Sequence, residues 1–308
     1  MSEQQNATLS RVADDEIDLR ELFAAIWQGK WIIIAVTLVF AVASVFYALS
    51  LPNIYKSEVL LAPVAEESGL KIPGQLGGLA ALAGVNLGSG GGDKTGLALE
   101  ILKSREFLGR FIERHDLFIP IMAAEGWSRA NNSLVLDADI YDNATKQWVR
   151  DVKPPFQPKP SLLEAHEAML ELLSTSQDKE TGMVKLAVQH YSPYLAQQWV
   201  SLLVTAINDE MRQRDLSEAQ NSINYLTAQL DKTNIADVRA MLFSLIEEQT
   251  KTVMLANVRD EYVFKTVDPA VVAEKKAKPA RALICILGVM LGGMLSVLIV
   301  LIRYFSKK

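Results

Sequence analysis

Two long uncharged stretches constrain this chain more than any other feature of its sequence. Residues 31–55 and residues 282–302 contain no charged side chain. Both stretches exceed the roughly 18 to 20 apolar residues that a membrane-spanning helix needs. The first is also longer than the roughly 7 to 15 residue core of a cleaved signal peptide. We therefore predict two retained transmembrane helices, at 31–51 and 282–302, and a cytosolic enzyme is excluded as a class.

Composition excludes further classes. The chain has 308 residues, of which 50% are hydrophobic and 22% are charged, and its formal net charge is −5. A disordered chain would contain fewer hydrophobic residues, and a nucleic-acid-binding module would carry a basic excess. The single cysteine, Cys285, lies inside the second uncharged stretch, so no intrachain disulfide can form. We predict that the chain associates with a membrane and has no nucleic-acid partner.

The two spans leave three other segments. Residues 1–30 end in apolar side chains at helical spacing, which predicts a short amphipathic helix in the headgroup region. These side chains are Leu19, Leu22, Phe23, Ile26 and Trp27. Residues 52–281 form a long loop, and residues 303–308 form a short tail. Because loop charge governs topology only over roughly 60 residues, the positive-inside rule does not decide which side the loop occupies.

A basic cluster stands just before the second span. It consists of Lys275, Lys276, Lys278 and Arg281. The simplest role for such a cluster is to anchor the chain to lipid headgroups, and the alternative is a patch that binds a partner or a glycan. The sequence leaves both roles open.

Hydrophobic periodicity within the long loop predicts a mixed α+β domain. Alternating apolar and polar residues predict strands at 55–63, 133–141, 147–152, 182–190 and 261–267. Helical spacing predicts helices at 97–114 and 161–174 and a very long helical stretch over about 193–258. The strands and the shorter helices should form a compact α/β base. The long stretch should extend from that base as a helical arm.

The helical arm carries its own packing signal. No proline or glycine occurs between Tyr194 and Asp268, so nothing in this stretch breaks a helix. Asn234 is suited to cap a second helix that runs to about Val258. Five apolar residues of the first helix recur at steps of three and four and predict a stripe packed against a partner helix. They are Leu216, Ala219, Ile223, Leu226 and Leu230.

One motif suggests nucleotide binding and is rejected. Residues 88–95 have the sequence Gly-Ser-Gly-Gly-Gly-Asp-Lys-Thr. A P-loop needs glycine immediately before the lysine, but Asp93 stands there, and its carboxylate would repel a phosphate. The glycine-rich segment 69–92 is therefore predicted to be a flexible loop.

No pattern in the sequence predicts catalysis or metal binding. His115, His166 and His190 lie on separate predicted elements and lack the spacing of a metal motif. No G-x-S-x-G nucleophile motif occurs, and adjacent acid pairs fit solvated positions. We predict no catalytic residue, no cofactor and no metal, and hence a protein that is not an enzyme.

The second span has one face of small residues. Gly288 and Gly292 form a GxxxG step, which Gly293 extends, and such a face lets another helix approach closely. Pro279 fixes the backbone just before this span. We predict that these four residues serve helix packing in the membrane or contact with a partner.

Several segments around the two spans carry a resemblance to a family. The sequence has Ile-Asp-Leu-Arg-Glu-Leu-Phe at 17–23, Trp-Gln-Gly-Lys-Trp at 27–31 and Leu-Pro-Asn-Ile-Tyr-Lys-Ser-Glu-Val-Leu-Leu-Ala-Pro at 51–63. Val-Asp-Pro-Ala follows at 267–270, then Pro279, then Leu-Gly-Val-Met-Leu-Gly-Gly-Met at 287–294. These segments resemble the Wzz-type O-antigen chain length determinants, which are class 1 polysaccharide co-polymerases. One departure is the charged segment 274–278, where the family tends to have prolines.

The resemblance implies an inner-membrane protein of a Gram-negative bacterium. Segment 1–30 and the tail 303–308 would lie in the cytoplasm, and residues 52–281, the α/β base with its helical arm, would lie in the periplasm. The implied partners are further copies of the chain in a ring-like homo-oligomer, the O-antigen polymerase and the growing lipid-linked polysaccharide. The implied function is to regulate the modal chain length of lipopolysaccharide O-antigen as a non-catalytic scaffold, without a cofactor.

Two alternatives stay open from the sequence. The first is a co-polymerase for capsule, exopolysaccharide or enterobacterial common antigen that works with an export or kinase partner. Because only residues 303–308 follow the second span, we expect any such kinase to be a separate chain. The second is a membrane-bound enzyme that modifies a glycan, such as a transferase.

Overall fold

A computed structural model describes Phe23 and residues 26–64 and 90–306 of the chain. The chain divides into two compact units, the span unit (Met1–Pro52 and Lys278–Lys308) and the central unit (Asn53–Ala277). Most of the predicted amphipathic helix and most of the glycine-rich segment 69–92 lie outside the described residues.

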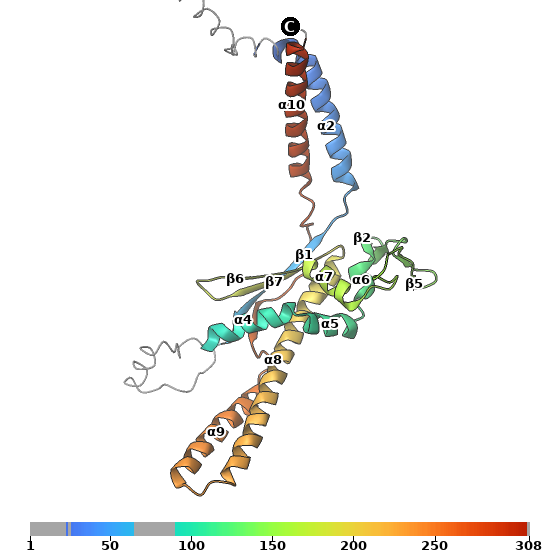
Figure 1. The fold of residues 1–308 in the computed structure, drawn as a ribbon. Helices are drawn as coiled ribbons and strands as arrows, with labels where there is room; N and C mark the ends of the chain where they lie inside the picture. The colour runs from blue at the N-terminus through green and yellow to red at the C-terminus, as the bar shows by residue number, and fades with distance from the viewer. Residues whose placement is uncertain (1–22, 24–25, 65–89, 307–308) are drawn as a thin grey trace, which may run out of the picture. The chain divides into compact units, whose positions relative to one another are not determined.

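The span unit contains a pair of apolar helices, α2 (Lys30–Ser50) and α10 (Arg281–Phe305) (Figure 1). Each contains a stretch of mean hydropathy 2.7 and is long enough to cross a membrane. The two helices contain the predicted spans except for Leu51, which follows α2 with an extended backbone. They pack against each other.

A four-stranded antiparallel sheet lies at the centre of the central unit. Its strands in spatial order are β6 (Leu173–Gln177), β7 (Val184–His190), β1 (Tyr55–Pro63) and β8 (Phe264–Asp268). β1 lies between two strands that are distant in sequence, and Tyr55 stands opposite His190. Val59 and Leu61 are buried while Glu58 between them is exposed, as expected for a strand with one covered face.

Helices α7 (Leu162–Leu172) and the first half of α8 (Pro193–Leu230) pack against this sheet. Three further helices pack on these two, with α4 (Gly90–Lys103) against α8 and both α5 (Arg105–Arg114) and α6 (Phe118–Met122) against α7. A capping box starts α7, in which the Ser161 hydroxyl and the Glu164 carboxylate each accept a hydrogen bond from the other residue's backbone N–H. Leu61 and Phe264 of the sheet share one hydrophobic core with Trp199 of α8.

Two short hairpins follow α6 in the sequence. They pair β2 (Ala124–Ser128) with β3 (Ser133–Leu136) and β4 (Tyr141–Asp142) with β5 (Gln147–Trp148). The strands predicted at 133–141 and 147–152 are therefore much shorter in the structure.

The predicted α+β class is confirmed, although several boundaries differ. The strand predicted at 55–63 is found with the same bounds. The single helix predicted at 97–114 is two helices, because the Ser104 hydroxyl accepts a hydrogen bond from the Phe107 N–H (3.2 Å) and caps α5. Two strands were not predicted from the sequence: β2, which contains a glycine, and β6, which is a polar edge strand.

The second half of α8 and the whole of α9 (Ala236–Val258) form a helical hairpin, which we call the arm (Figure 1). α8 is buried in the base through Met211, and beyond that residue it runs alongside α9. The long helical stretch predicted over about 193–258 is therefore two helices joined by a short turn.

The turn of the arm is closed by a residue that the sequence analysis did not identify. Asn234 was predicted to cap α9, but the residue before the helix is Ile235, and no side chain caps it. Instead, the Arg239 guanidinium donates to the carbonyl oxygens of Leu230 (3.1 Å) and Thr233 (3.3 Å). A cation at the C-terminal end of α8 also suits the helix dipole.

Candidate functional site

The small-residue face of α10 packs directly on α2. A Cβ atom added at Gly288 would collide with the side chain of Ser44, and one added at Gly292 would lie 2.6 Å from the Phe40 Cβ. Real Cβ atoms essentially never approach other heavy atoms this closely, so both positions require glycine at this helix separation. The structure therefore brings these two predicted packing residues to one interface.

The other two predicted packing residues lie elsewhere. A Cβ atom at Gly293 would meet nothing within 4 Å, so this glycine does not face α2. Pro279 precedes α10, and its carbonyl oxygen accepts a hydrogen bond from the Arg281 N–H (3.0 Å). Contact of Gly293 with a partner stays a prediction.

The α2 side of the interface includes residues that the sequence analysis did not single out. Gly29, which precedes α2, lies against Val300 near the end of α10, while Ser44 near the end of α2 lies against Gly288. Residue numbers rise on one helix as they fall on the other, so the two helices are antiparallel. Buried Ser296 meets its hydrogen-bonding need inside its own helix, where its hydroxyl donates to the Gly293 carbonyl oxygen (2.7 Å).

A buried asparagine fixes where the arm leaves the base. Asn208 of α8 is only 4% exposed. Its Oδ1 accepts hydrogen bonds from the backbone N–H groups of Tyr262 (3.2 Å), Val263 (2.8 Å) and Phe264 (2.9 Å). Its Nδ2 donates to the Phe264 carbonyl oxygen (3.0 Å). One side chain thus holds the chain that returns from α9 against α8.

Charged side chains surround α8 at the same level. The Asp215 carboxylate accepts hydrogen bonds from the Tyr262 hydroxyl (2.6 Å) and the Lys94 ammonium (2.9 Å). The Glu210 carboxylate contacts Arg110 of α5 (2.8 Å) and Arg214 of α8 (2.7 Å). These contacts tie the root of the arm to α4, α5 and the returning chain.

Further along the arm, the predicted stripe is only partly covered. Ala219 and Leu230 are buried, whereas Leu216, Ile223 and Leu226 are half-buried. The α9 side of the hairpin contributes two buried residues, Leu242 and Ala256. The partner helix that the stripe requires is therefore α9, but α9 does not cover the stripe completely.

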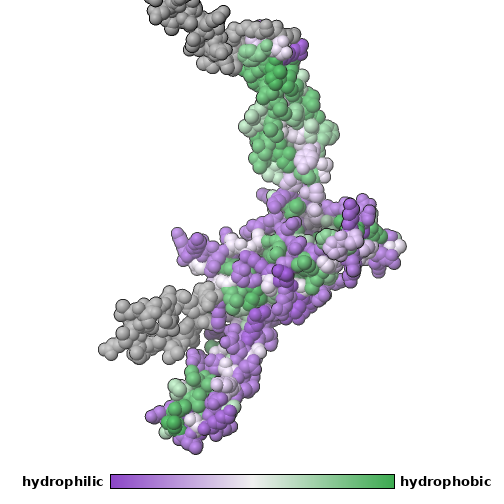
Figure 2. Space-filling view, viewed as in Figure 1, coloured by the Kyte–Doolittle hydropathy of each residue, from purple (hydrophilic) through white to green (hydrophobic). Residues whose placement is uncertain are grey.

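The arm exposes large apolar side chains to water. They are Tyr225, Ile235, Met241, Phe243, Leu245, Met254 and Val258. Figure 2 shows hydrophobic residues gathered near the far end of the arm. Exposed apolar groups that cluster on one element are typical of an interaction surface.

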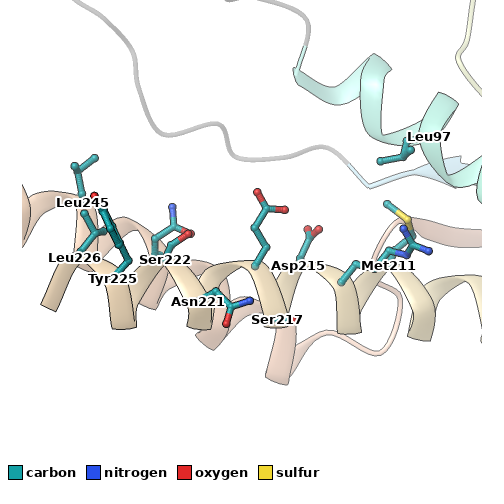
Figure 3. A pocket seen from close by; sticks show the side chains of 12 residues that line it. Leu97, Met211, Asp215, Ser217, Asn221, Ser222, Tyr225, Leu226 and Leu245 are labelled. Carbon is teal, nitrogen blue, oxygen red and sulfur yellow. The ribbon is translucent and has the colours of Figure 1, made fainter. Parts of the chain in front are cut away.

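A groove of about 830 Å³ runs along the arm, and Figure 3 shows its lining. Asp215, Glu218 and Asn221 follow one another along α8. Leu97 of α4 and Leu245 of α9 lie at opposite ends of the groove in Figure 3. These polar groups line a surface and do not converge on one point. Among the residues that the structure describes, no group of three or more His, Cys, Asp or Glu could hold a metal ion.

The histidines have structural surroundings. His190 is buried, and because its Nδ1 accepts a hydrogen bond from the Ser192 N–H (3.1 Å), its Nε2 carries the proton and donates to the Pro120 carbonyl oxygen (2.9 Å). Burial lowers the pKa of His190 below its ordinary value, so the neutral form is favoured. His166 donates from Nε2 to the Lys103 carbonyl oxygen (2.9 Å), and the ring of His115 packs on Phe111.

Two family models match the chain. One, described as chain length determinant protein, matches residues 15–115, and the other, described as G-rich domain on putative tyrosine kinase, matches residues 231–305. Between them the matches include both span helices, strands β1 and β8, and all of α9. The chain belongs to the polysaccharide co-polymerase family.

Comparisons with solved structures and with curated protein sequences add no further support for the family. A solved structure described as a full-length bacterial polysaccharide co-polymerase is 14% identical, covers 95% of this chain and 98% of its own, and has a TM-score of 0.40. No curated protein sequence matches this chain. Family membership therefore rests on the two family models.

Membership in this family indicates the general role of the co-polymerase. It acts in the determination of polysaccharide chain length. Its two apolar helices and its family together indicate a protein of the bacterial inner membrane.

The co-polymerase also depends on residues that sequence patterns reveal only in part. Asn208 is a polar residue among apolar neighbours on the buried face of α8, such as Val204, Ile207 and Met211, and that interruption is a usable signal of a buried polar contact. Gly29 offers no such signal, because its importance comes from the part of α10 that happens to face it.

Proposed function

We propose that this co-polymerase sets the modal length of lipopolysaccharide O-antigen as a homo-oligomeric scaffold that works with the O-antigen polymerase. The observation that carries the proposal is the arm, whose exposed apolar side chains are costly to hydrate in a lone chain, at about 25 cal/mol per Å². Contact with neighbouring copies would remove that surface from water. The shape of the arm would then be a property of the assembly, which is what a scaffold for polymer length needs.

The proposed topology places both termini in the cytoplasm and residues 53–277 in the periplasm. Support comes from the antiparallel packing of α2 and α10, since antiparallel spans leave both chain ends on one side of the membrane. An alkaline phosphatase reporter, active only in the periplasm, should be active when fused after Arg150 and silent when fused after Lys308. The reverse pattern would overturn the topology.

Deletion of the coding sequence tests the function. Electrophoresis of lipopolysaccharide from the deletion strain should show polymer still present but spread over lengths without a preferred cluster. Complete loss of polymer would favour a direct chemical role, such as that of a glycan-modifying enzyme.

A second candidate is a co-polymerase for capsule, exopolysaccharide or enterobacterial common antigen. The observation that favours it is the match of residues 231–305 to a domain named for putative tyrosine kinases. In that case the deletion would leave the lipopolysaccharide pattern unchanged and alter the length of the other polymer, and a separate kinase or export protein would be the partner.

A further inference from the structure

A second pocket lies in the central unit, well separated in the fold from the arm groove. It has a volume of about 840 Å³ and is formed where the start of β1, the β2–β3 hairpin, the start of α8 and the segment 272–275 meet. We call it the aromatic pocket. Its volume lies within the roughly 300 to 1,000 Å³ of pockets that bind small organic ligands.

Three aromatic rings from three different elements line this pocket. Trp127 of β2 contacts Tyr55 of β1 edge-on, with 5.7 Å between ring centroids, and contacts Tyr194 of α8 at 6.1 Å. The Trp127 indole N–H donates to the Asn132 side-chain oxygen (3.0 Å), which fixes the indole in place. Tyr194 is 50% exposed, so one of these rings is open to a ligand.

Another part of the pocket lining, residues 272–275, is held by hydrogen bonds at both of its ends. The buried Ser57 hydroxyl of β1 donates to the Val271 carbonyl oxygen (2.8 Å), and the Ala277 N–H donates to the Ile54 carbonyl oxygen (2.8 Å). Residues 272–275 lie between these two attachments and line the pocket. The pocket is therefore built into the fold and does not depend on a loop tied at one end.

The polar side chains that line the pocket include both positive and negative charges. Arg129 and Lys275 supply donors, Glu274 supplies a carboxylate acceptor, and the amide nitrogen of Asn132 can donate because its oxygen already accepts from Trp127. A site for a bare phosphate would present cations without a carboxylate, since Glu274 repels an anion. A ligand whose groups both donate and accept fits this set better.

We propose that the aromatic pocket binds carbohydrate, as a segment of one or a few pyranose rings. The C–H face of a sugar ring packs on an aromatic face, and its hydroxyls donate to Glu274 while they accept from Arg129, Lys275 and Asn132. The inference that the pocket binds carbohydrate depends only on these lining residues and their chemistry. Its assignment to the polymer whose length is determined rests on the proposed function.

Purified full-length protein in detergent tests the site. The probe is the delipidated polysaccharide pool of the producing strain, titrated while saturation-transfer NMR reports contacts to sugar protons. Tyr194→Ala should weaken binding about tenfold, because it removes a half-exposed aromatic contact without opening the core. Trp127→Phe, which keeps an aromatic ring, should retain binding within about threefold. The matched control is Tyr225→Ala, at an exposed tyrosine of the same helix that lines the arm groove, and it should bind as the wild type does.

Four results would overturn the inference. The first is no binding of the polysaccharide pool, and the second is equal binding by the wild type and Tyr194→Ala. The third is competition by inorganic phosphate, or Tyr194-dependent binding to phosphatidylglycerol vesicles, which would identify an anion or lipid site. The fourth is a change in oligomer size in Tyr194→Ala with glycan binding intact, which would identify a contact between copies of the chain.

The outcomes separate this inference from the proposed function. If deletion abolishes the modal length of the polymer while Tyr194→Ala binds glycan normally, the function stands and the site is wrong. If Tyr194→Ala loses glycan binding while deletion leaves every polymer length unchanged, the site stands and the function is wrong.

Discussion

The span pair α2–α10 and the arm pair α8–α9 are both antiparallel helix pairs joined in one chain, yet they pack by opposite means. In the span pair, Gly288 and Gly292 let the backbones approach, and the large apolar side chains point outward (Figure 2). That arrangement suits lipid, which solvates apolar side chains as well as a neighbouring helix does. In the arm pair, the outward apolar side chains face water, where their exposure is unfavourable. The span pair is therefore complete in a membrane, whereas the arm pair calls for a partner.

The largest effect is expected when the close approach of the spans is blocked. Gly288→Leu with Gly292→Leu keeps α10 hydrophobic enough to insert, but the new side chains collide with Ser44 and Phe40. Membrane level should persist, while cross-linking shows loosened oligomers and electrophoresis shows a broadened polymer length distribution. Gly293→Leu is the comparison variant: nothing of the chain lies within 4 Å of its Cβ position, so it should leave the α2–α10 contact intact and test only the predicted contact of this glycine with a partner. Unchanged polymer lengths and unchanged cross-linking in the Gly288→Leu, Gly292→Leu variant would show that the face meets only lipid.

The next largest effect is expected at the root of the arm. Asn208→Ala leaves the backbone N–H groups of Tyr262, Val263 and Phe264 buried without their acceptor, at roughly 1 to 3 kcal/mol for each unsatisfied group. We expect a loss of about 3 kcal/mol or more, measured as a lowered Tm by circular dichroism in detergent. Asn224→Ala, at an exposed position of the same helix, should change the unfolding free energy by less than about 0.5 kcal/mol. A similar Tm for both variants would contradict the conclusion that Asn208 holds the chain returning from α9 against α8.

A smaller effect on stability, with a clear effect on function, is expected on the stripe of the arm. Ile223→Ser and Leu226→Ser remove half-buried apolar contacts, at roughly 1 kcal/mol each. Because the arm pair needs a partner, the modal polymer length should shift or broaden while total polymer stays near normal on a gel. Loss of all polymer, with the protein still in the membrane, would contradict a scaffold role and favour direct chemistry.

The smallest effect is a dependence of stability on pH at the foot of α8. Burial lowers the pKa of His190 in the folded state, so below the ordinary value of about 6.5 the unfolded chain binds a proton that the folded chain does not. The contribution of neutral His190 to folding stability is therefore fully present above about pH 7. It falls as the pH drops below 6.5 toward the lowered pKa of the folded state. The Tm should fall between pH 7.5 and pH 5.5 more in the wild type than in His190→Gln. Parallel Tm curves for the two proteins would show that His190 does not couple to folding.

The sequence alone determined the features that depend on local pattern. The two uncharged stretches correspond closely to α2 and α10, and strand 55–63 has its predicted bounds, because long apolar runs and strict alternation have few competing structures. The α+β class and the presence of a long helical arm follow from the same periodicities. A resemblance in the segments that flank the spans was enough to indicate the family.

The tertiary structure decided which residues meet. Gly288 and Gly292 face α2 while Gly293 does not, although the sequence gives all three the same chemistry, because only the rotation of one helix against the other selects a face. Arg239 replaces Asn234 at the turn, and Asn208 clamps residues distant in sequence, since both roles depend on where the chain returns. The aromatic pocket joins Tyr55, Trp127 and Tyr194, which share no periodicity and meet only because β1, β2 and α8 are packed together. Contacts of this kind are set by long-range packing, which no local pattern encodes.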